Sequence, residues 1–205
     1  MSRLASLLVV AALAAPASAD TFKLFGEVHG GGAYGQGTSG AQKDSSFFQQ
    51  ARGGAYGALI GAELLFFDGL IEHTQFVNGD HLTTWTQFGL GLHFTSDLGT
   101  AEEQKAHKGG YVEMGAYLWF GLGTGAQVMP PLDNAQITDK AFLAEGRFGF
   151  GKHLSKVFDL GVVVPVSYGY FFKSGNGAAV NNLDTHYQSV QAEALLTLRA
   201  NIRLF

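Results

Sequence analysis

The feature that most constrains this chain is an alternation of apolar and polar side chains with a period of two residues. Segment Tyr111–Leu122 has an apolar residue at every second position, and segment Lys140–Gly151 sets its phenylalanines against Glu145 and Arg147. Because successive side chains of a β-strand point to opposite faces, this period predicts strands with one apolar and one polar face. The remaining alternating segments are Phe22–Tyr34, Arg52–Phe67, Leu70–Val77, Leu82–Phe94, Phe158–Phe172 and Gln191–Leu204.

Composition points to a membrane barrel built from these strands. The 205 residues include 29 glycines and 17 phenylalanines but no cysteine. Beyond residue 19 no apolar stretch approaches the roughly 18 residues that a spanning helix needs. Phenylalanine favours pleated surfaces, whereas glycine disfavours helices. We therefore predict an all-β fold: an antiparallel, transmembrane, up-and-down β-barrel of eight strands, formed by residues 20–205 as a single domain.

The N-terminus has the layout of a secretory signal. Arg3 precedes the apolar run Leu4–Ala15, and Ala17 and Ala19 form an A-x-A cleavage site. We expect residues 1–19 to be a signal peptide cleaved after Ala19. The alternative is an N-terminal membrane anchor, for which the apolar run is short. Export of a barrel predicts an outer-membrane location.

Turn signals suggest how the strands connect. Asp68-Gly69 is typical of a tight hairpin turn, and a second turn is expected near Lys152–Lys156. With both termini in the periplasm, the polar ranges 35–50, 123–138 and 173–183 become surface loops. Segment Thr95–Lys108 is long for a periplasmic turn, and a helical turn is expected around Ala101–Ala106. Pro165 cannot donate a ladder hydrogen bond, which predicts a bulge or local distortion there.

The polar faces of the strands converge on the barrel interior. An eight-stranded barrel is just wide enough to be filled by side chains, and a buried charge is costly unless it is paired. We predict a salt-bridge and hydrogen-bond network that plugs the lumen, with Arg147 paired to Glu113 or Glu145. The alternative is a narrow polar conduit or a small-ligand pocket. The expected network is Glu27, His29, His93, Glu113, Glu145, Arg147, Glu193 and Arg199, with Lys23, Glu63 and His73 on the same faces.

Catalytic, metal and nucleic-acid sites are not predicted. The seven histidines show no HxxxH spacing and no cysteine assists them, although His73 and His93 are expected to face the same interior. No motif surrounds Ser167, Ser189 and His186, so we predict no enzyme and no cofactor. Basic residues are scattered and the net charge is -4, which gives no sign of nucleic-acid binding. An interfacial aromatic girdle is expected from Tyr34, Tyr168, Tyr170, Phe171 and Phe172.

The whole pattern, with its terminal aromatic Phe205, resembles the eight-stranded outer-membrane barrels of the OmpA, OmpX and OmpW type. Phe205 departs from the family signal, because the apolar row ends one residue earlier at Leu204. The resemblance implies a Gram-negative outer membrane, contact with its lipid and lipopolysaccharide, and contact with other envelope proteins. We expect a structural or docking role, for example within a secretion or gliding-motility machine. The alternatives are a narrow channel, a conduit for small hydrophobic molecules, or a lipid-active enzyme.

Overall fold

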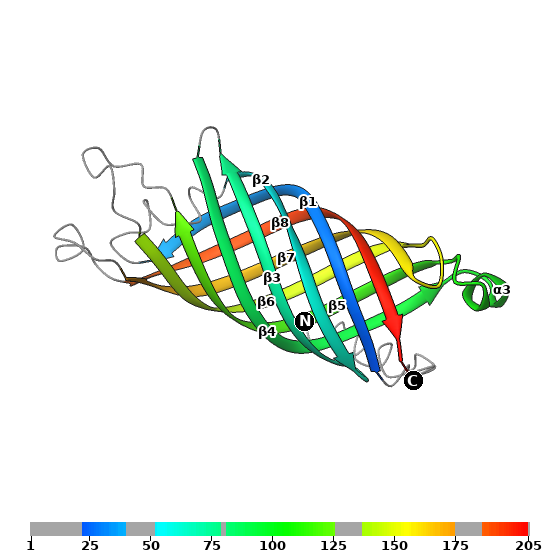
Figure 1. The fold of residues 1–205 in the computed structure, drawn as a ribbon. Coiled ribbons are helices and arrows are strands. Elements are labelled where there is room, and N and C mark those ends of the chain that lie inside the picture. Colours follow the sequence, from blue (N-terminus) through cyan, green and yellow to red (C-terminus); the bar gives the residue numbers. More distant parts are fainter. Residues whose placement is uncertain (1–21, 40–51, 79–80, 126–136, 175–185, 205) are drawn as a thin grey trace, which may run out of the picture.

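The computed structural model describes residues 22–39, 52–78, 81–125, 137–174 and 186–204. They form one closed antiparallel barrel in which each strand pairs with its sequence neighbours and β1 pairs with β8 (Figure 1). This confirms the predicted all-β, eight-stranded, up-and-down barrel. The expected signal peptide lies outside the described residues, as does Phe205. The strands are β1 (Phe22–Ser39), β2 (Gly53–Leu64), β3 (Phe67–Asn78), β4 (His81–Leu98), β5 (Gly110–Gly125), β6 (Ile137–His153), β7 (Phe158–Ser174) and β8 (His186–Arg203).

The barrel wall is apolar outside and largely polar inside, which is the reverse of a soluble protein. On the outer face, Leu90 is 73% exposed and Leu118 is 71% exposed. On the inner face, Glu113 and Arg147 are buried. An outer face this apolar is stable only where it meets hydrocarbon. A closed barrel suits that environment because it leaves no unpaired strand edge in lipid. Among the residues described, no helix is long and apolar enough to cross a membrane.

The strand registers show that the barrel is strongly sheared. Pairing followed from Lys23 around all eight strands returns to β1 at Gly35, which is 12 residues further along. With standard strand spacings, this shear tilts the strands by about 45°. At a given strand number a larger shear means a wider barrel, so the interior has room for arginine and tryptophan side chains.

Glycines on the inner face make space for those large side chains. A Cβ atom on Gly89 would overlap the ring of Trp119, and one on Gly121 would overlap Trp85. A Cβ atom on Gly149 would overlap the carboxylate arm of Glu113. The abundance of glycine in the sequence therefore serves the packing of the interior as well as the twist of the wall.

The first hairpin turn was predicted at the wrong residues. The structure turns at Leu65 and Phe66, and Asp68 and Gly69 belong to β3. Leu65 takes a left-handed φ of 61°, and the Phe66 ring stacks on Phe94 at 6.0 Å. An apolar turn suits a membrane interface, where aromatic rings are favoured. The polar Asp68 is instead buried inside the barrel.

The second turn and the distortion at Pro165 occur where the sequence predicts them, whereas one residue of the expected aromatic girdle faces inward. The turn expected near Lys152–Lys156 lies at residues 154–157. The pairing of β7 with β8 is interrupted at Pro165. The register is the same on either side of the interruption, so the distortion involves no inserted residue. Phe171, expected in the outer girdle, faces inward and stacks on Tyr187. The strands extend into the predicted loops 35–50, 123–138 and 173–183, whose remaining residues fall outside the described ranges.

The segment between β4 and β5 contains the predicted helical turn. Helix α3 (Ala101–Lys105) starts at Thr100, which forms a capping box with Glu103. The backbone N–H of Thr100 donates to the Glu103 carboxylate at 2.9 Å and lowers the pKa of that group. None of the helix residues is buried, and α3 projects beyond the barrel at the end where β1 begins and β8 finishes (Figure 1). We call this the terminal end.

Candidate functional site: the charged interior

Arg199 on β8 holds together one half of the buried charge network. Its guanidinium group binds Glu113 through two nitrogens, at 2.6 and 3.1 Å. The same group donates from Nε to Glu27 at 2.9 Å. Its charge also lies over the Phe25 ring, 5.6 Å from the centroid. One cation thus bridges carboxylates from β1 and β5, which lie on opposite parts of the wall.

Arg147 on β6 plays the same role in the other half. It donates from Nε to Glu145 at 2.7 Å and from Nη2 to Glu72 at 2.9 Å. Glu72 also accepts a 2.6 Å hydrogen bond from Gln87. Arg147 lies over the rings of Trp119 and Tyr117, at 5.5 and 5.6 Å. Strands β3, β4 and β6 are therefore connected through the lumen.

His29 lies between the two arginine centres. Its Nε2 atom is 3.3 Å from Thr74 Oγ1 and 3.7 Å from a Glu72 oxygen. Its Nδ1 atom is 3.8 Å from Glu27 and has no hydrogen-bond partner among the described atoms. The imidazole therefore fills the space between Glu27 of the Arg199 centre and Glu72 of the Arg147 centre.

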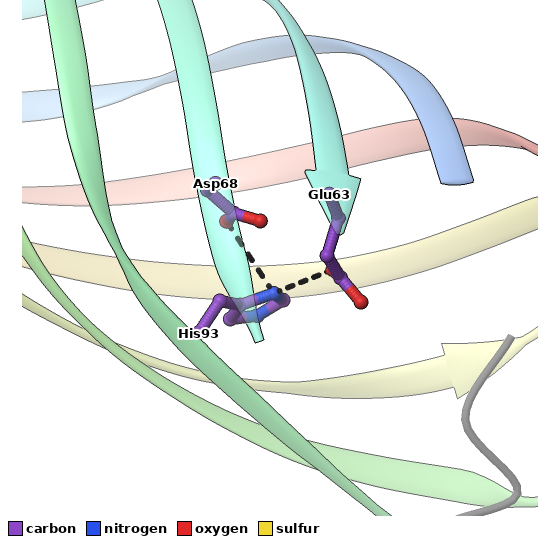
Figure 2. Close-up of side chains that lie close together, drawn as sticks. All are labelled: Glu63, Asp68 and His93. Carbon is purple, nitrogen blue, oxygen red and sulfur yellow. Dashed lines mark hydrogen bonds and ion pairs between the residues drawn. The ribbon is translucent and has the colours of Figure 1, made fainter. Parts of the chain in front are cut away.

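A third cluster lies nearer the terminal end, where Glu63, Asp68 and His93 converge from β2, β3 and β4 (Figure 2). His93 Nδ1 is 3.2 Å from Glu63 and 3.6 Å from Asp68, while His93 Nε2 is 3.3 Å from Glu113. Lys23 binds Glu63 at 2.6 Å. Through Glu113 this cluster is continuous with the Arg199 centre.

A second histidine at this end is held differently. His153 Nδ1 is 2.6 Å from Asp159, and its Nε2 is 3.2 Å from Asp97. Asn201 donates to the other Asp159 oxygen at 2.6 Å. The two carboxylates therefore meet opposite nitrogens of one ring, so they cannot share a single ion with it.

Towards the opposite end the interior is filled by aromatic side chains. The rings of Phe171 and Tyr187 stack at 4.8 Å, and Trp85 packs against Phe171 at 5.8 Å. These side chains are almost fully buried, as is Phe76 on β3. The lumen thus passes from paired charges to an aromatic layer.

A cavity of about 10 Å³ lies near the charges, with room for about one water molecule.

The eight residues expected in the network all face inward. Seven of them lie in the contacts described above, and Glu193 accepts a hydrogen bond from Gln191. His73 was predicted to face the interior, and this prediction is wrong. Its side chain is exposed on the outer face, where it forms a hydrogen bond with Thr86 at 2.8 Å. Ser167 and Ser189 point into the barrel while His186 is exposed, so these three residues do not assemble a catalytic set.

Sequence reasoning missed two central acidic residues. The partners of Arg147 are Glu145 and Glu72, whereas Glu113 belongs to Arg199. Asp68 was hidden by the turn predicted at Asp68-Gly69, and Glu72 was hidden by its neighbour His73, which was expected to face inward in its place. The alternation Asp68, Leu70, Glu72, Thr74 was the signal available, and all four are buried.

We predict strong coupling between Arg147 and Glu72. Arg147→Met leaves two buried carboxylates without their cation and should lower the free energy of unfolding by roughly 3–5 kcal/mol. Adding Glu72→Gln should recover part of that loss, because one stranded charge disappears. Urea titration in detergent micelles measures both. His153→Gln is the control, and its effect should add to that of Arg147→Met within roughly 0.5 kcal/mol. Strict additivity of Arg147→Met and Glu72→Gln would contradict the pairing.

The fold is similar to that of a known solved structure. No protein-family model matches the chain, and no curated protein does. Among solved structures, Neisserial surface protein A (NspA) is similar over 90% of this chain and 97% of its own, with a TM-score of 0.50 and 12% identity. The outer membrane protein OprG from Pseudomonas aeruginosa is also found, with 8% identity, a TM-score of 0.41, and coverage of 89% and 96%. The likeness to NspA is one of fold: this chain is an eight-stranded β-barrel of the outer-membrane type.

Proposed function

We propose that this protein is a closed, non-enzymatic barrel of the outer membrane that serves as a structural or docking component of the cell envelope. The filled lumen carries the proposal. Two arginines each bridge two carboxylates across the interior, and an aromatic layer follows. An eight-stranded barrel packed in this way leaves its surfaces and its two ends to interact with other molecules.

The outer face suits contact with lipid and lipopolysaccharide. Its apolar rows include Leu90, Leu118 and Phe148, all more than half exposed. Tyr168 and Tyr170, near the end opposite α3, are exposed on the same face. Tyrosine is typical of the girdle where a barrel wall meets lipid headgroups. These features support a barrel wall that lies in the lipid of the outer membrane.

The terminal end is our candidate for docking and for the periplasmic side. Two of its connections are short, at residues 65–66 and 154–157, as is usual for periplasmic turns. Its third connection contains α3, whose charged residues Glu102, Glu103 and Lys105 are exposed. A capped helix that buries nothing against its own barrel is available to another envelope protein, which would fit membership of an envelope-spanning assembly.

A closed lumen should not conduct. Purified barrels inserted into planar bilayers should give negligible ion current, because the charges are paired and the aromatic layer excludes water. A general porin measured in the same bilayers supplies the positive control, and heat-modifiable gel migration verifies that the barrel is folded. Reproducible single-channel currents from the wild-type protein would refute the closed barrel and favour the conduit.

Docking through α3 can be tested inside cells. A photo-crosslinking amino acid at Glu102 should yield discrete protein adducts upon illumination. The same probe at Leu118, on the lipid-facing wall, is the matched control and should yield none. Charge reversal by Lys105→Glu should weaken the adducts from position 102 without reducing barrel assembly. If position 102 gives no protein adduct in assembled barrels, the docking role of this end is wrong.

A further inference from the structure

We propose that Glu63, Asp68 and His93 form a zinc site inside the terminal end of the barrel. The three side chains come from the consecutive strands β2, β3 and β4 and point toward one another (Figure 2). One ligand atom from each lies within 4.8 Å of the others. Imidazole nitrogen and carboxylate oxygens are among the ligands that Zn²⁺ binds in proteins. Such a site would be separate from the docking role of α3.

Both distances measured from His93 Nδ1 are compatible with ligands of one ion. Two ligand atoms each about 2.1 Å from a tetrahedral zinc ion lie about 3.4 Å apart. His93 Nδ1 is 3.2 Å from Glu63 Oε2 and 3.6 Å from Asp68 Oδ2. The longer distance exceeds that of a hydrogen bond. A single proton on Nδ1 therefore serves Glu63 alone, whereas an ion at the centre can serve all three groups.

The ligands are already held by a second layer of contacts. His93 Nε2 faces Glu113 Oε2 at 3.3 Å, and Glu113 is fixed by Arg199. A proton on Nε2 directed to Glu113 leaves the Nδ1 lone pair facing Glu63 and Asp68. This carboxylate–histidine–metal relation recurs in protein metal sites, where it sets the tautomer and the ring orientation. Tyr117 similarly donates to Asp68 Oδ2 at 2.9 Å.

The second oxygen of the Asp68 carboxylate, beside the Oδ2 atom that faces His93, has an unused capacity to accept a hydrogen bond. Asp68 Oδ1 has no hydrogen-bond partner among the described residues, and the Asp68 side chain is only 1% exposed. Leaving a buried carboxylate oxygen without a partner is costly. The cavity of about 10 Å³ is lined by Asp68 and His93. This space could hold one water molecule as a fourth ligand of the ion.

The local charge balance also favours a cation. Four carboxylates, from Glu27, Glu63, Asp68 and Glu113, face two permanent cations, Lys23 and Arg199. A divalent ion would offset the remaining negative charge. Glu63 and Lys23 are 15% and 14% exposed, so an ion can reach the site from the barrel end. Lys23 competes for the same Glu63 oxygen, so zinc must displace it.

The experiment measures zinc binding to the detergent-purified barrel after chelator treatment, by calorimetry with Zn²⁺ and by absorption spectroscopy with Co²⁺ as a probe. We expect one ion per barrel. His93→Gln and Asp68→Asn should each weaken the zinc affinity by at least about 10-fold, because a loss of that size already follows when only the hydrogen-bond partners of a metal ligand are changed. Lys23→Met should strengthen it, because the competing ammonium group is removed.

His153→Gln is the matched control, since it removes another buried, carboxylate-flanked histidine at the same end and should leave zinc affinity unchanged. Heat-modifiable migration shows that each variant is folded. The proposal is overturned if the wild-type barrel shows no stoichiometric zinc binding, which would mean that a proton on His93 suffices. It is equally overturned if His93→Gln and Asp68→Asn bind zinc as tightly as wild type.

Discussion

The structure depends on pairing buried charge across a closed space. Arg199 joins Glu27 to Glu113, and Arg147 joins Glu72 to Glu145. Arg199 on β8 therefore binds carboxylates from two other strands, β1 and β5. Arg147 on β6 binds one carboxylate from its own strand and one from β3. Removing charged groups from water carries a large desolvation penalty. Only good geometry with several hydrogen bonds offsets that penalty. The strand order and registers must therefore bring these groups together.

That requirement links the wall to the interior. A shear of 12 residues widens the barrel, so that long side chains are needed to span it. Inner-face glycines such as Gly121 and Gly149 then admit the bulk of Trp85 and Glu113. Outside, hydrocarbon replaces the hydrophobic core that a soluble protein would have. Interior polarity and exterior apolarity are thus two results of one alternating pattern.

The fold was largely predictable from sequence because a period of two residues fixes which side chains share a face. In β5 and β6 the apolar row and the polar row were assigned correctly, including the inward facing of Glu113, Glu145 and Arg147. The expectation failed in β3, where an apolar turn at Leu65 and Phe66 carries none of the usual turn residues. The misplaced turn hid Asp68, and the inward facing expected of His73 hid its neighbour Glu72. The partner of Arg147 stayed open between Glu113 and Glu145 because sequence does not fix the strand register.

Pairing within the site could not be read from sequence for a further reason. Facing depends on local alternation, but partnership depends on register and on distance across the lumen. Arg199 and Glu113 are separated by 86 residues, and Arg147 and Glu72 by 75. Neither separation has a local signature. The cluster of Glu63, Asp68 and His93 likewise arises only after three strands are placed in register.

The most direct test of the paired interior is hydrogen exchange at the two arginine side chains. Nitrogen-15 NMR of the barrel in micelles, with Arg147→Lys and Arg199→Lys to assign the signals, resolves their Nε–H groups. Nε of Arg147 donates to Glu145 and that of Arg199 to Glu27. Both should exchange far more slowly than the Nε–H of free arginine in the same buffer. Exchange at both positions as rapid as that of free arginine would contradict a lumen closed by paired charge.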